Sequence, residues 1–148
     1  MVYFRTLFFL IILSVAGKSA SLPAGCAARD YLNRRLAYWQ QRLELGDWKI
    51  SLVMSRAGGL KPNTLGNIHW DADRRTAVIR VLDAPDYQMP CSGMLHDMEV
   101  TVVHEPVHLE LAALPRSAAS RREEEHAVNR ITDALLALER QDAERDAR

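Results

Sequence analysis

The sequence contains the pattern His-Glu-x-x-His, formed by His104, Glu105 and His108. This spacing is typical of sites that bind zinc and accept a proton. Side chains four residues apart project from the same face of an α-helix, so both imidazoles could bind one Zn²⁺. The glutamate that follows the first histidine could accept a proton from a water molecule that the metal activates. The pattern therefore predicts Zn²⁺ as the cofactor, His104 and His108 as metal ligands and Glu105 as the catalytic residue.

A third protein ligand is required, because catalytic zinc sites bind three side chains and leave one position for water or substrate. The run Glu123-Glu124-Glu125 lies in the first turns of the last predicted helix. At about 100° per residue, Glu124 points with the apolar face that we expect to centre near Ile131 and Leu138. A carboxylate on a buried face needs a partner. We therefore predict Glu124 as the third ligand and Glu125 as the next choice, although acids in a first helical turn can also simply favour the helix dipole.

Hydrophobic periodicity predicts one small α+β domain with a three-stranded sheet around this motif. The chain has 148 residues, of which 48% are hydrophobic and 26% charged, and this length fits a single domain. The predicted elements are a helix over about 30–45, strands over 48–55, 65–70 and 76–82, the motif helix from 98 to about 113, and a closing helix from about 120. The last two strands should form an antiparallel hairpin across the charged turn at 71–75.

Capping residues set the expected ends of the helices. Asp30 is predicted as the N-cap of the first helix, and Gly46 as the glycine after its last turn. Asp97 is the expected N-cap of the motif helix. Ser120 and Glu123 have the spacing of a capping box at the start of the closing helix.

The first 20 residues have the layout of a secretory signal peptide, with cleavage expected between 19 and 25. Arg5 precedes an apolar run over 7–17, and small residues follow. This run is shorter than a membrane span requires. We therefore expect a secreted or periplasmic protein, with an uncleaved N-terminal anchor as the alternative.

Cys26 and Cys91 are the two cysteines of the chain. In an exported protein they permit one disulfide, which would join the start of the mature chain to the loop before the motif helix. Two free thiols are an equal alternative. A third is a lipid anchor on Cys26, because Pro23-Ala24-Gly25-Cys26 is a partial lipobox.

The mature part of the chain is expected to comprise a domain over 26–140 and a charged, solvated tail over 141–148. The formal net charge of the whole chain is zero, which favours neither nucleic acid nor an anionic membrane surface as a partner. We expect a monomer with no membrane attachment once the signal peptide is removed.

The histidine motif, followed after one loop by a helix that carries Glu124 and Glu125, resembles the gluzincin class of zinc metallopeptidases. It looks most like the small members, in which a three-stranded sheet packs on the motif helix, and the resemblance covers about 48–138. It implies a zincin-like minimal domain with an N-terminal and a C-terminal helix. It also implies that the protein hydrolyses peptide bonds in a peptide or protein substrate by means of a metal-activated water.

Two further features of the resemblance concern the substrate and the third ligand. In such proteins an edge strand of the sheet pairs with the extended substrate, and here that strand would be 65–70 or 76–82. The ligand glutamate is often followed four residues later by Asp or Asn. Glu125 and Asn129 match this spacing, whereas Glu124 does not.

Pro106 departs from the motif, because proline lacks the N–H that would bond the carbonyl of Val102 and its ring crowds that carbonyl. A proline inside a helix costs about 3 kcal/mol or more, and a kink could move the histidines out of metal-binding geometry. One alternative function is therefore a catalytically inactive metallopeptidase-like domain that binds peptides or protein partners. Another is a small exported α+β protein without a metal site.

Overall fold

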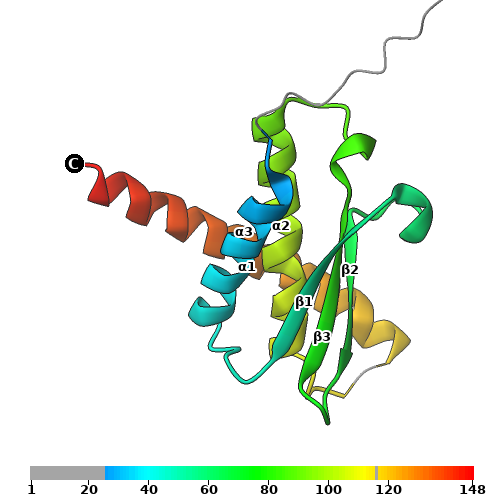
Figure 1. Ribbon diagram of the computed structural model, residues 1–148. Coiled ribbons are helices and arrows are strands. Elements are labelled where there is room, and N and C mark those ends of the chain that lie inside the picture. The colour runs from blue at the N-terminus through cyan, green and yellow to red at the C-terminus, as the bar shows by residue number, and fades with distance from the viewer. Residues whose placement is uncertain (1–25, 116) are drawn as a thin grey trace, which may run out of the picture.

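Three α-helices and three strands are the main elements of the described part of the chain, residues 26–115 and 117–148, in a computed structural model (Figure 1). The elements are α1 (Ala28–Arg42), β1 (Lys49–Ser55), β2 (Gly66–Asp71), β3 (Thr76–Leu82), α2 (Cys91–Glu110) and α3 (Ala118–Asp146). The architecture is α+β, as predicted. The expected signal peptide lies outside the described residues, and none of the helices within them has both the length and the apolar character of a membrane span.

The strand β3 is the centre of a mixed three-stranded sheet with the order β1-β3-β2. The β2–β3 hairpin is antiparallel, as predicted, whereas β1 pairs with β3 in parallel. Ala77, Ile79 and Val81 alternate along β3 and are buried. Because β3 is paired on both sides, the prediction that 76–82 could be an edge for substrate is wrong, and β2 is the strand that retains this possibility.

The helix α2 lies between the sheet and the other two helices, and it contacts α1, α3, β2 and β3. Its fully buried apolar side chains are distributed around much of its circumference and include Met94, Met98, Val102, Val103 and Val107. Burial of one such side chain contributes roughly 1.5–3 kcal/mol. The helix that carries the histidine motif is therefore also the centre of the hydrophobic core.

The ends of α1 and α2 differ from the predicted ones. Ala27 is the N-cap of α1, and Asp30 lies in the first turn, where its charge still favours the helix dipole. At the other end Glu44, with a φ of 53°, adopts the left-handed conformation expected of Gly46. The helix α2 begins well before Asp97, because the preceding residues bury apolar side chains in the core instead of forming a loop.

The capping box of α3 is made by Ser117 and Ser120, so the predicted box of Ser120 and Glu123 is shifted by one turn. The Ser117 hydroxyl accepts from the backbone N–H of Ser120 at 3.0 Å, and the Ser120 hydroxyl accepts from the N–H of Ser117 at 2.7 Å. The helix then continues to Asp146, because no glycine or proline interrupts it. The charged tail is thus mostly helical, and the last turns of α3 extend beyond the other elements (Figure 1).

Cys26 and Cys91 form a disulfide, which settles the choice between a bond and two free thiols. The bond joins the residues at the starts of α1 and α2, whose Cα atoms are 6.0 Å apart. It therefore restrains the unfolded chain between two helices that pack together in the core.

Replacing both cysteines by serine should lower the free energy of unfolding by about 4 kcal/mol, because the bond closes a loop with a sequence separation of 65 residues. Urea denaturation of the two proteins at equal pH measures the difference. Titration of thiols in the unfolded wild type should find none. Two reactive thiols there would contradict the disulfide.

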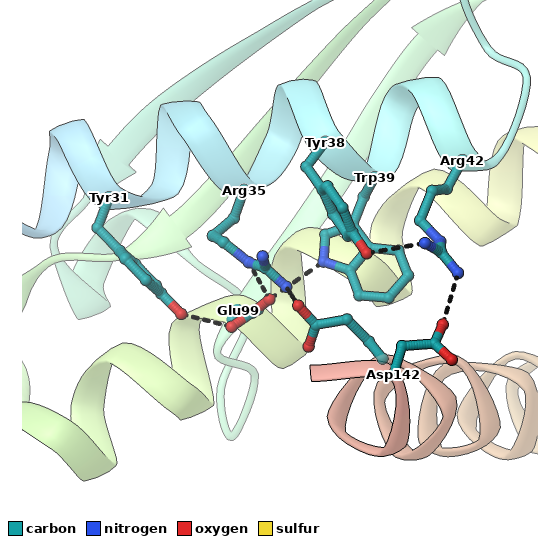
Figure 2. Close-up of polar contacts among 8 residues, drawn as sticks. Tyr31, Arg35, Tyr38, Trp39, Arg42, Glu99 and Asp142 are labelled. Carbon is teal, nitrogen blue, oxygen red and sulfur yellow. Dashed lines mark hydrogen bonds and ion pairs between the residues drawn. The ribbon is translucent and has the colours of Figure 1, made fainter. Parts of the chain in front are cut away.

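Glu99 is a buried carboxylate of α2 that accepts hydrogen bonds from three side chains of α1 (Figure 2). The donors are the Tyr31 hydroxyl, the Arg35 guanidinium and the indole N–H of Trp39, the last at 3.1 Å. Arg35 also donates to Glu139 of α3 at 2.6 Å. Burial, together with the hydrogen bond to Glu99, raises the pKa of Tyr31 to about 12, so the phenol remains a donor. One guanidinium therefore links all three helices.

Glu99→Ala should destabilise the protein by about 3–5 kcal/mol, because it leaves the Arg35 charge without its partner in α2. Glu99→Gln should cost less, since the amide can still accept from Arg35 and Trp39. Thermal and urea unfolding measure both losses. Glu144→Ala, the same truncation at an exposed position of α3, is the matched control and should leave stability unchanged. Equal stability of Glu99→Ala and the wild type would contradict this role.

Candidate metal centre

The two motif histidines converge with Glu125 at the start of α3. His104 Nε2 and His108 Nε2 are 3.2 Å apart. The carboxylate oxygens of Glu125 lie 3.5 Å from His104 Nε2 and 3.4 Å from His108 Nε2. Among the described residues, these three are the group of His, Cys, Asp and Glu side chains that could hold a metal ion.

The spacing of these atoms fits zinc. Bonds of about 2.0–2.1 Å in a tetrahedral site place neighbouring ligand atoms about 3.3 Å apart. The two Nε2 atoms are 3.2 Å apart, and Glu125 places one oxygen near each of them, Oε1 at 3.4 Å from His108 and Oε2 at 3.5 Å from His104. The donor set of two imidazoles and one carboxylate is also one that catalytic zinc uses, with a fourth position left for water or substrate.

Glu124 has a different place beside the same histidine. Its Oε1 is 2.8 Å from His108 Nδ1, and the two side chains are only 12% and 9% exposed. A carboxylate at Nδ1 keeps the proton on that nitrogen and leaves the lone pair of Nε2 for a metal. Glu124 thus points inward, as predicted, but the geometry favours it as the group that orients His108 and favours Glu125 as the third ligand.

The exchange of roles follows from the rotation of α3. Ile131 and Leu138, the expected centre of its apolar face, are 40% and 55% exposed. The buried stripe is centred on Thr132 instead, one residue or about 100° further around the helix. Glu125, seven residues before Thr132, therefore has the place relative to the buried stripe that the prediction gave to Glu124, seven residues before Ile131.

Asn129 hydrogen-bonds His104, as the spacing from Glu125 in the resemblance implied. Burial and the neighbouring His108 lower the pKa of His104, and they outweigh Glu125 and Asn129, which act in the opposite direction. A neutral imidazole is the form that binds a metal. Each histidine therefore has one polar neighbour on α3 that orients it and a ring nitrogen that faces Glu125.

Glu105 is buried, with 7% of its surface exposed, and it lines the same cleft as the histidines. Burial and, to a lesser extent, the charge of Glu125 raise its pKa to about 7. A carboxyl group with such a pKa can both accept and release a proton near neutral pH.

The cleft next to these residues has a volume of about 620 Å³. Its walls come from β2 and the loop before it, from α2, and from the first turns of α3. Asn67, Ile68 and Trp70 of β2 contribute to its lining, and so do the cations Lys61 and Arg121. No sequence pattern indicated these two cations, because their proximity depends on the packing of a loop against α3.

Pro106 does not break the motif helix. The helix α2 is continuous from Cys91 to Glu110 with Pro106 inside it. The proline side chain is fully buried. Packing around it therefore offsets the lost hydrogen bond to the Val102 carbonyl, and the expected displacement of the histidines is absent.

Comparison of the chain with protein-family models, with curated proteins and with solved structures gives no match. The case for a metal centre therefore depends on the geometry of these side chains.

Glu125→Gln should weaken zinc binding at least tenfold more than Glu124→Gln, because it removes a ligand charge instead of a partner of a ligand. Loss of the group that orients a ligand histidine typically costs about 10–100-fold in affinity. Competition with a chromogenic chelator measures both dissociation constants. Glu123→Gln, in the same acidic run but outside the lining of the cleft, is the control and should bind as the wild type does. A larger loss in Glu124→Gln would reverse the assignment.

Proposed function

We propose that this protein is a zinc-dependent peptidase that hydrolyses peptide bonds with a metal-activated water. The observation that carries the proposal is the convergence of His104, His108 and Glu125 at distances suited to zinc, with Glu105 in the same cleft. A zincin-like domain, with the sheet packed on the motif helix, is part of the same proposal. It is supported by the contacts of α2 with β2 and β3.

The residues of the cleft suit this chemistry. Zinc would supply a Lewis acid that lowers the pKa of water and polarises a carbonyl. Glu105 would take the proton of the attacking water and deliver it to the nitrogen of the departing amine. Its pKa of about 7 allows both transfers. Glu124 and Asn129 would hold the two imidazoles in the orientation that the site requires.

An extended peptide is the substrate that the cleft fits best. The strand β2 is an edge of the sheet, and three of its side chains line the cleft beside the histidines. Backbone groups on an open strand edge can pair with a peptide as an added strand. This pairing would place a peptide bond near the metal without any requirement for a particular side chain.

Export of the protein belongs to the same proposal. The Cys26–Cys91 disulfide supports it, because such bonds persist in oxidising compartments and are rare in the cytosol. Export would bring the enzyme into contact with extracellular or periplasmic peptides.

Glu105→Gln should reduce cleavage of an unstructured protein by about 10²–10⁴-fold, because the amide cannot accept the proton, while zinc stays bound. Zinc content, measured on the same samples as the cleavage rate, separates loss of chemistry from loss of the metal. Glu110→Gln, in the last turn of the same helix, is the matched control and should retain activity.

Stoichiometric zinc without any cleavage by the wild type would reject the peptidase. It would leave a catalytically inactive domain that binds peptides. Absence of zinc in wild type purified without chelators and supplied with the metal would reject the metal centre as well.

A further inference from the structure

Arg35 connects the helix that carries the histidines with the helix that carries the glutamates. Its guanidinium pairs with Glu99 of α2 (Figure 2). It also pairs with Glu139 of α3 at 2.6 Å. The planar guanidinium presents its donors in a fixed fork, so it orients both carboxylates relative to one another. Its side chain is 18% exposed and those of the two acids 9% and 24%. The link is thus largely shielded from water.

This link acts at a distance from the metal centre. Glu99 is five residues before His104 on α2, and Glu139 is fourteen residues after Glu125 on α3. At 1.5 Å per residue, the two acids of α3 are about 21 Å apart. Between them, Val128, Thr132 and Leu136 pack inward, and Leu136 meets Trp39 and Val103.

A long helix held at widely separated points cannot tilt freely. A tilt of α3 by about 5° around its Arg35 contact would move Glu125 by about 2 Å over that length. Functional sites tolerate errors of only about 0.5 Å in the position of their groups. Stability alone does not require an ion pair here, because apolar side chains in such places stabilise a fold at least as well.

We propose that Arg35 and Glu139 are positioning residues, which fix α3 so that Glu124 and Glu125 meet His108 and His104. The role of these two residues in placing α3 can be tested without a metal. The expected effect of this positioning on zinc affinity rests on the proposed function. Neither residue touches the cleft.

The first test observes His108 in the metal-free protein. Long-range ¹H–¹⁵N spectra of the wild type at pH 8 should show His108 protonated at Nδ1, the nitrogen that faces Glu124. In Glu139→Ala the His108 signals should shift toward a mixture of tautomers. Glu139→Gln should restore the wild-type signals, because its amide oxygen can accept from Arg35.

The second test measures zinc affinity at a temperature where circular dichroism shows each variant fully folded. Glu139→Ala should raise the zinc dissociation constant about tenfold or more, the range found when an orienting group is lost, and Glu139→Gln should recover most of it. Asp142→Ala is the matched control on α3, since Asp142 pairs with Arg42 of α1 at an exposed position. It should leave both the spectra and the affinity unchanged.

Unchanged His108 signals in Glu139→Ala would overturn the inference, whatever its stability. A zinc affinity of Glu139→Ala equal to that of the wild type would also overturn it. A wild type that binds no zinc would defeat the proposed function, and the spectra of the metal-free protein would still decide the positioning role.

Discussion

The burial of α2 around most of its circumference is the constraint on which the rest of the structure depends. The sheet covers one side of this helix, and α1 and α3 cover others. The same packing holds Pro106 inside a continuous helix and keeps His104 and His108 with their Nε2 atoms 3.2 Å apart. Without that surrounding core, the proline would be expected to bend the helix between the two ligands.

Local patterns predicted the parts of the fold in which one periodicity decides. The apolar runs on either side of the charged turn at 71–75 predicted the antiparallel hairpin, and β2 pairs with β3 in this way. Strand order was not predictable in this way, because the parallel pairing of β1 with β3 depends on how the whole chain crosses the core. The placement of β2 at an edge of the sheet, with β3 in the centre, therefore had to come from the structure.

The rotation of α3 shows why the third ligand was harder to predict. Ile131 and Leu138 form an apolar stripe that remains exposed, whereas the inner side of the helix carries the buried, polar Thr132 and the half-buried, charged Glu139. A pattern analysis favours the apolar stripe, because an isolated buried charge is costly. Glu139 is tolerated on the inner side because Arg35 of α1 pairs with it, and a contact between residues so far apart in the chain leaves no signal in the local sequence.

The histidine motif was recognisable from its spacing, but the division of roles between Glu124 and Glu125 depends on that rotation. The most direct test of the central claim is a crystal structure of the zinc-loaded protein, with the metal located by its anomalous scattering. We predict one zinc ion at about 2.0–2.2 Å from His104 Nε2, His108 Nε2 and a carboxylate oxygen of Glu125, with Glu124 on His108 Nδ1. Zinc bound to Glu124 in place of Glu125, or bound only at other residues, would contradict it.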